Sequence, residues 1–260
     1  ESSTVSGGYY NCILSSFSVI SGGKCNSISA TGLCSSIGGG FKNTISAKYS
    51  VISGVCNTIS ANIGTIGGGC KSTASACGTF IGGGFTNVAS SLYSVISGGR
   101  NNLSQGIYAT IGGGICNNAC NSTSGCLALG GVVVGGVGNN TCGGTWTLAN
   151  CCFTVAPTIC NAGSMSFIGG GFQNRASGNC SAVLGGQCNV ASGVFSGAFG
   201  CGLTASCPCT FYANNLCACG NISLSGISAG CSVCVGADGT LTGFSGGGGG
   251  IIVADTGTGS

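Results

Sequence analysis

The sequence predicts an all-β fold, a parallel β-solenoid built of coils of about 15 residues. Three observations predict it: an apolar residue that returns at a near-constant interval, glycines directly after it, and an Asn about six residues further on. The pattern is clearest in residues 94–104, where Ile96 precedes Gly98 and Gly99, and Asn102 follows. A fixed interval of this length is typical of repeat proteins in which successive units stack on one another.

Each coil is expected to hold two short strands and two corners. A β-branched pair ends in an inward-facing residue, which we call the anchor, because neighbouring strand residues point to opposite faces. Glycine permits a sharp turn, and Asn tolerates left-handed backbone and bonds to its own backbone, which suits a corner. A second strand follows the Asn. The expected anchors are Val5, Ile20, Ile37, Ile52, Ile66, Ile81, Ile96, Ile111, Ile168, Leu184 and Phe199, and the expected corner residues are Asn11, Asn26, Asn43, Asn57, Asn87, Asn102, Asn117, Asn174 and Asn189.

The composition excludes several other classes of protein. Few charges and a mean hydropathy of +0.53 argue against a disordered chain, and the glycines lack the every-third spacing of collagen. Abundant Gly with β-branched residues is unfavourable for helices. No apolar run is long enough for a membrane helix, and six scattered basic residues are no nucleic-acid footprint. We therefore expect no nucleic-acid partner and no membrane span.

The repeat resembles those of known surface proteins. The run of residues 93–99 that continues to Asn102, with Ala-Ser at residues 176–177 and 191–192, resembles the head repeats of trimeric autotransporter adhesins, the YadA-like adhesins. It resembles more closely the related repeats of viral and phage fibre proteins, and residues 211–216 are similar to the segment that follows such arrays. The resemblance covers roughly residues 1–120 and 164–205. It implies a left-handed parallel β-roll in which three chains associate about a long axis.

A homotrimer is also expected from the residues themselves. A coil of about 15 residues encloses one thin layer of side chains, so much apolar surface stays outside it. With so few charges, packing against identical copies in a closed ring covers that surface. The alternative is a monomeric solenoid whose outer face of Ser, Thr and Asn is soluble.

The regular pattern is interrupted once and ends before the C-terminus. We expect a β-roll array in 1–120, an insertion or irregular coils in 121–163, a second block of repeats in 164–205, and a β-rich segment with a glycine-rich connector in 206–260. Binding residues tend to lie where a regular scaffold is interrupted, so the candidate receptor contacts are Trp146, Phe153 and Tyr212. Packing at the discontinuity is the other interpretation of Trp146. Because Val5 already lies in an anchor position, we expect the chain to be part of a longer or processed precursor.

The 22 cysteines leave three interpretations open: buried packing thiols, disulfides or metal ligands. Cys70 occurs where other coils have Phe, and Cys34 occurs where others have Tyr, which favours packing thiols. Disulfides are expected outside the regular coils, among Cys142, Cys151, Cys152 and Cys160 or in residues 207–234. Without His, and with only isolated CxxC-like spacings, the sequence predicts no metal site.

Catalysis is not expected, because the chain has no His and no paired acids. No cofactor is predicted, since the glycine runs lack the Gly-Lys-Ser/Thr ending of a phosphate loop. The sequence predicts a non-enzymatic structural or adhesive segment of a virion tail or surface fibre, which contacts a host glycan or protein. The alternatives are a bacterial cell-surface trimeric adhesin and a self-assembling extracellular filament. The expected location is the virion surface or the extracellular space.

Overall fold

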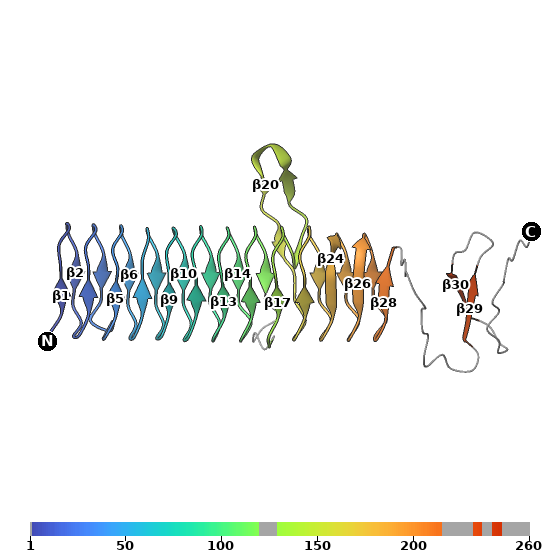
Figure 1. Cartoon of the computed structure of the whole chain (residues 1–260), viewed down its shortest axis with the longest axis horizontal. Helices are drawn as coiled ribbons and strands as arrows, with labels where there is room; N and C mark the ends of the chain where they lie inside the picture. Colours follow the sequence, from blue (N-terminus) through green and yellow to red (C-terminus); the bar gives the residue numbers. More distant parts are fainter. Residues whose placement is uncertain (1, 120–128, 215–230, 236–240, 246–260) are drawn as a thin grey trace, which may run out of the picture. The chain divides into compact units, whose positions relative to one another are not determined.

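The computed structural model describes residues 2–119, 129–214, 231–235 and 241–245. The chain divides into two units, Glu1–Asn215 and Leu216–Ser260. The first unit is a parallel β-solenoid, drawn from blue to orange in Figure 1. The described part of the second unit is an antiparallel pair of strands, β29 (Cys231–Val235) and β30 (Leu241–Ser245).

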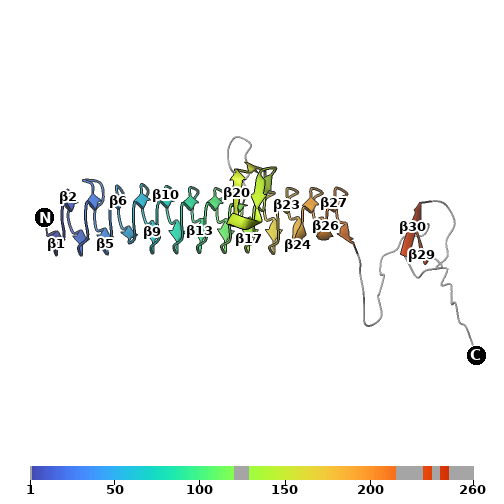
Figure 2. The ribbon, with the colours of Figure 1, turned by 90° about the horizontal axis from the view of Figure 1, so that it is seen from above.

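The coils of the solenoid stack so that each strand pairs with its equivalent in the next coil. Figure 2 shows the two sheets as opposite edges of the stack. One sheet has 13 strands: β1 (Thr4–Val5), β3 (Val19–Ile20), β5 (Ser36–Ile37), β7 (Val51–Ile52), β9 (Thr65–Ile66), β11 (Phe80–Ile81), β13 (Val95–Ile96), β15 (Thr110–Ile111), β17 (Val132–Val133), β22 (Phe167–Ile168), β24 (Ala182–Gln187), β26 (Gly197–Cys201) and β28 (Phe211–Ala213). The opposite sheet has eight strands: β2 (Cys12–Ile13), β4 (Ser27–Ile28), β6 (Thr44–Ile45), β8 (Thr58–Ile59), β10 (Thr73–Ala74), β12 (Val88–Ala89), β14 (Leu103–Ser104) and β16 (Asn118–Ala119). It resumes after an insertion with β23 (Arg175–Ala176), β25 (Val190–Ala191) and β27 (Thr204–Ala205).

The core is one layer of side chains between the two sheets. Each two-residue strand turns its second residue inward, as the alternation of strand side chains requires. The predicted anchors from Ile20 to Ile168 are fully buried, and they face buried Ile or Ala from the opposite sheet, with buried Ser104 in one coil. Val5 pairs in register with Ile20 but is 44% exposed, because its coil is the first one in the stack.

Two predicted anchors are wrong by one residue. Val183 pairs with Ile168 and fills the core position, whereas Leu184 points outward. In the next coil Ala198 takes the position, and Phe199 is exposed. Leu184 and Phe199 are the larger apolar residues beside the glycines, but the interval of 15 residues from Ile168 fixes the register at their smaller neighbours.

The stack also extends further than predicted. Ala198 pairs with Tyr212, so β28 adds a coil beyond the expected boundary at residue 205. In the interrupted region, β17 pairs with both β15 and β22, so residues 129–140 form a regular coil and the insertion begins after it.

One glycine in each coil lies where no side chain fits. Gly99 has a φ of +89°, and a Cβ atom built on it would lie 2.2 Å from the carbonyl oxygen of Gly114 in the next coil. The glycine therefore permits the close approach of successive turns. Two more positions in each regular coil have left-handed backbone, one before the first strand and one before the corner Asn. Most of them are not glycines, as at Tyr93 and Asn101, although Gly78 and Gly138 are exceptions.

The corner asparagines act through their side chains, as one part of the prediction had it, and none of them has the left-handed backbone that the other part allowed. Asn102 Oδ1 accepts a hydrogen bond from the backbone N–H of Asn117 at 3.0 Å. Its Nδ2 donates to the carbonyl oxygens of Gly98 and Gly114, both at 3.0 Å. Equivalent side-chain-to-backbone bonds link Asn11, Asn26, Asn43, Asn57, Ser72, Asn87, Asn102, Asn117, Asn139, Asn174, Asn189 and the N–H of Leu203. We call this row the asparagine ladder, and every predicted corner Asn belongs to it.

Candidate binding cleft beneath the inserted hairpin

A hairpin leaves the stack after the coil of β17. It contains β18 (Thr141–Cys142), β19 (Thr145–Thr147), the 3-10 turn η1 (Leu148–Asn150), β20 (Cys152–Val155) and β21 (Thr158–Ile159). Strand β18 pairs with β21 at its base and β19 pairs with β20 further out, both antiparallel. Figure 1 shows it rising from the side of the stack in yellow-green. Cys151 turns the tip with left-handed backbone at a φ of +46°.

The base of the hairpin is held by a disulfide within the hairpin and by a hydrogen bond to the coils. A disulfide joins Cys142 to Cys160, which are among the four cysteines predicted to form disulfides, whereas Cys151 and Cys152 are free. Asn140 Nδ2 donates to the carbonyl oxygen of Asn118 at 2.9 Å. The interruption of the repeat is therefore an anchored element.

Removing the disulfide should loosen the hairpin and leave the stack intact. The bond closes a loop with a sequence separation of 18, and a loop of this length is worth about 3 kcal/mol in the chain-entropy account. In Cys142→Ser we expect faster proteolytic cleavage within residues 143–159 and an unchanged far-ultraviolet circular dichroism spectrum. Cys151→Ser is the control, because Cys151 is exposed and unpaired. Equal cleavage rates in the two variants would contradict the expectation.

Trp146 and Phe153 meet on the side of the hairpin that faces the coils. Their ring centroids are 5.1 Å apart in an edge-on arrangement, and Trp146 lies 6.0 Å from Phe172 of the solenoid. Edge-to-face contacts of this kind are stabilising, and all three side chains are half-buried. This contact favours the packing interpretation of Trp146. Tyr212 is not part of the cluster and packs against the core in the last described coil.

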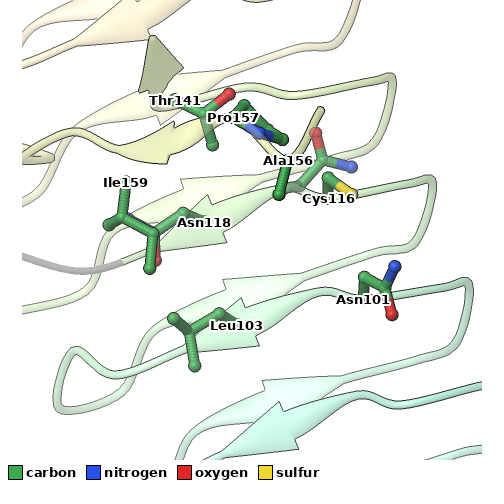
Figure 3. Close-up of a pocket in the computed structure, with 9 residues that line it drawn as sticks. Asn101, Leu103, Cys116, Asn118, Thr141, Ala156, Pro157 and Ile159 are labelled. Carbon is green, nitrogen blue, oxygen red and sulfur yellow. The ribbon is translucent and has the colours of Figure 1, made fainter. Parts of the chain in front are cut away.

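A cleft of about 240 Å³ lies between the hairpin and the second-strand side of the coils. As Figure 3 shows, one wall comes from the coils and the other from the hairpin. It is lined by Asn101, Leu103, Cys116, Asn117, Asn118, Thr141, Ala156, Pro157 and Ile159. It is smaller than the roughly 300 Å³ at which pockets for drug-sized ligands begin. The cleft therefore suits one ring or one side chain of a larger ligand.

The polar groups of the cleft are neutral. Burial raises the pKa of the Cys116 thiol, and this outweighs the opposing effects of a hydrogen bond from Asn101 and the charge of Arg100. Asn118 Nδ2 donates to the carbonyl oxygen of Cys160 at 3.2 Å, but its buried Oδ1 has no hydrogen-bond partner. Amides and a protonated thiol can orient a ligand through hydrogen bonds.

The wall of the cleft that the coils form was not predicted from the sequence. Leu103, Cys116 and Asn118 belong to regular coils, where scaffold residues were expected. The available signal was the doublet Asn117–Asn118, in which a second Asn begins the second strand where the two preceding coils have Val88 and Leu103. The described part of the chain holds no group of three or more His, Cys, Asp or Glu side chains arranged to bind a metal ion.

The cysteines of the regular coils do not behave as predicted. Every free cysteine of residues 2–119 and 129–214 is exposed or half-buried, so the expectation of buried packing thiols is wrong there. Cysteine does share positions with Phe and Tyr, but these positions point outward. The pair Cys217 and Cys219 lies outside the described residues.

Over the described residues, no helix combines the length and the apolar character needed to cross a bilayer. No protein-family model matches the chain, and no curated protein is significantly similar to it in sequence.

Proposed function

We propose that this chain is a non-enzymatic structural and adhesive segment of a virion fibre that works as a homotrimer, in the left-handed β-roll arrangement that the resemblance implies. The observation that carries the proposal is the combination of a long stack of near-identical coils with one anchored hairpin and cleft at its side. A stack of this kind holds a binding element at a fixed distance from its base. The hairpin and the cleft are the parts that would contact a host glycan or protein.

An exposed apolar row supports the homotrimer. The residue three before each core anchor has left-handed backbone and points outward, and we call this set the apolar row. Its large members are each half or more exposed in the single chain: Phe17, Tyr49, Ile63, Tyr93, Tyr108, Met165 and Phe195. Tyr93 and Tyr108 stack with ring centroids 5.4 Å apart, so members of the row in neighbouring coils contact each other. Strips of this kind on soluble proteins mark contact surfaces, and a closed ring of identical copies covers them symmetrically.

The mass in solution tests the homotrimer. Light scattering should give three times the chain mass of 24.7 kDa. Tyr93→Asp combined with Tyr108→Asp should yield monomers, because a buried carboxylate is costly while Asp tolerates left-handed backbone. Lys48→Asp is the control, since this exposed position lies beside the apolar row and not in it. A monomeric parent chain would refute the trimer, and a trimeric double variant would refute the apolar row as its interface.

Electron microscopy tests the virion fibre against its two alternatives. Antibodies raised against the chain should decorate projections of fixed length on virus particles. Decoration of a cell envelope would instead identify a bacterial adhesin, and open-ended filaments of the purified chain would identify a self-assembling filament.

A further inference from the structure

One corner of the solenoid concentrates cations and aromatic rings. It is formed by the fourth and fifth residues after each anchor, or the third and fourth in the shorter coil of Ile52. The first residue of each two pairs from coil to coil in the order Tyr9, Lys24, Phe41, Val55, Cys70, Phe85, Arg100. Lys42 and Lys71 occupy the fifth position in their coils. We call the exposed cations Lys24, Lys42, Lys71 and Arg100, with the rings beside them, the basic corner.

The rings hold the cations in place. Lys24 Nζ lies 5.6 Å from the centre of the Tyr9 ring, and Lys42 Nζ lies 5.2 Å from that of Phe41. Phe85 is contacted twice, by Lys71 Nζ at 5.9 Å and by the guanidinium carbon of Arg100 at 5.7 Å. Contacts within about 6 Å of a ring are attractive, so they restrict where these long side chains carry their charge.

No carboxylate of the described solenoid balances this charge. All six basic residues lie in the described ranges, whereas Glu1, Asp238 and Asp255 fall outside them. Four of the six cations are gathered on the basic corner. A row of one sign without internal counterions attracts a polyanion.

We infer that the basic corner binds a linear anionic polysaccharide that carries one carboxylate per disaccharide, and that this glycan is the host ligand of the fibre proposed above. Lys42, Lys71 and Arg100 follow one another at intervals of two coils, which is about 10 Å at the usual strand spacing. This interval is comparable to the length of one disaccharide unit in an extended polysaccharide. Aromatic side chains beside the cations add apolar surface for sugar rings.

The density of charge favours a polysaccharide over a nucleic acid. Lys24 and Arg100 are five coils apart, so the basic corner presents four cations over about 24 Å. DNA carries one phosphate per about 3.4 Å along each strand, which is more than twice as dense. Most of its phosphates would find no cation here, whereas a sparsely charged polysaccharide matches the row.

The basic corner also leads into the cleft beneath the hairpin. Asn101 directly follows Arg100 in the chain and lines the cleft, as does Cys116 at the same corner of the next coil. A glycan that lies along the corner therefore reaches the cleft with one of its rings. This continuity joins the basic corner to the cleft in one surface.

Binding of the full-length chain to immobilised hyaluronan tests the inference, with dextran as the neutral polymer and poly(dT) as the nucleic acid. We expect binding to hyaluronan at about 10 mM salt that weakens strongly at about 150 mM, and none to dextran. Lys71→Gln and Arg100→Gln should each lower the affinity about threefold, as expected for exposed ionic contacts, and the quadruple variant at all four cations should not bind. Lys48→Gln is the matched control, because Lys48 is equally exposed but lies off the basic corner.

The outcomes separate this inference from the fibre proposal. Equal affinities of Lys71→Gln and Lys48→Gln, binding to dextran, tighter binding to poly(dT) than to hyaluronan, or no binding at all would each overturn the basic corner as a polysaccharide site. None of these results changes the mass of the particle or its place on a virion, which test the fibre. Circular dichroism of the quadruple variant should match that of the parent, because all four side chains are exposed.

Discussion

Replacing Gly99 by Ala is expected to destabilise the solenoid by about 3 kcal/mol or more, because the new methyl group has no room and the backbone is left-handed. The added Cβ would lie 2.2 Å from Gly114 O, 2.7 Å from Asn102 Nδ2 and 2.8 Å from Gly114 N. Two of these three atoms belong to the backbone of the next coil, so relief requires the two coils to separate. The midpoint of thermal unfolding, followed by circular dichroism, measures the effect.

The neighbouring glycine provides the control. At Gly98 a Cβ atom would meet nothing within 4 Å, and the backbone is not left-handed. Gly98→Ala should therefore change stability by less than about 0.5 kcal/mol, as most surface substitutions do. If the two variants unfold at the same temperature, the close approach of successive turns at Gly99 does not limit the stability of the stack.

Breaking the asparagine ladder at Asn102 is expected to cost about 3 kcal/mol. In Asn102→Leu the backbone N–H of Asn117 loses its acceptor inside the stack, and the two bonds donated by Nδ2 disappear. One unsatisfied buried group costs about 1–3 kcal/mol, and each lost hydrogen bond adds about 1 kcal/mol. Since stability in repeat proteins depends on contacts between neighbouring units, hydrogen exchange should rise first in the coils next to Asn102.

The chain itself supplies the matched control for this variant. Ser72 occupies the same position in another coil, and its Oγ accepts the N–H of Asn87 at 3.3 Å. Asn102→Ser keeps an acceptor for Asn117 and should therefore cost about half as much as Asn102→Leu, or about 1.5 kcal/mol. Equal losses in the two variants would show that the accepted bond contributes little.

The repeat made most of the architecture predictable. Two-residue strands, glycine turns and a recurring Asn can be read directly from residues such as Ile96, Gly99 and Asn102, because each acts within its own coil or on the next one. The errors at Leu184 and Phe199 arose where two apolar residues are adjacent, and the backbone pairing between coils chose the smaller one.

The site was less predictable than the scaffold. The insertion at 121–163 was expected to be a place of binding, and Trp146 and Phe153 do lie on its hairpin, but they pack against Phe172. The cleft wall from Leu103, Cys116 and Asn118 was missed, because these residues lie in regular coils and only the doublet Asn117–Asn118 sets one of them apart in sequence. The four cations of the basic corner looked scattered along the chain, since neighbours on a solenoid corner are about one coil apart in sequence.

The sequence by itself determined the class of fold, the length of the coil and the inward-facing residues of most coils. It could do so because each coil repeats the same local pattern of short strand, glycine turn and corner Asn. Only the tertiary structure decided which of the outward-pointing residues are neighbours on the surface. Stacking turns an interval of about 15 residues into a distance of about 4.8 Å, so Lys71, Phe85 and Arg100 become neighbours on one ridge. The same stacking left the cysteines outside the core and placed the cleft where the hairpin returns to the coils.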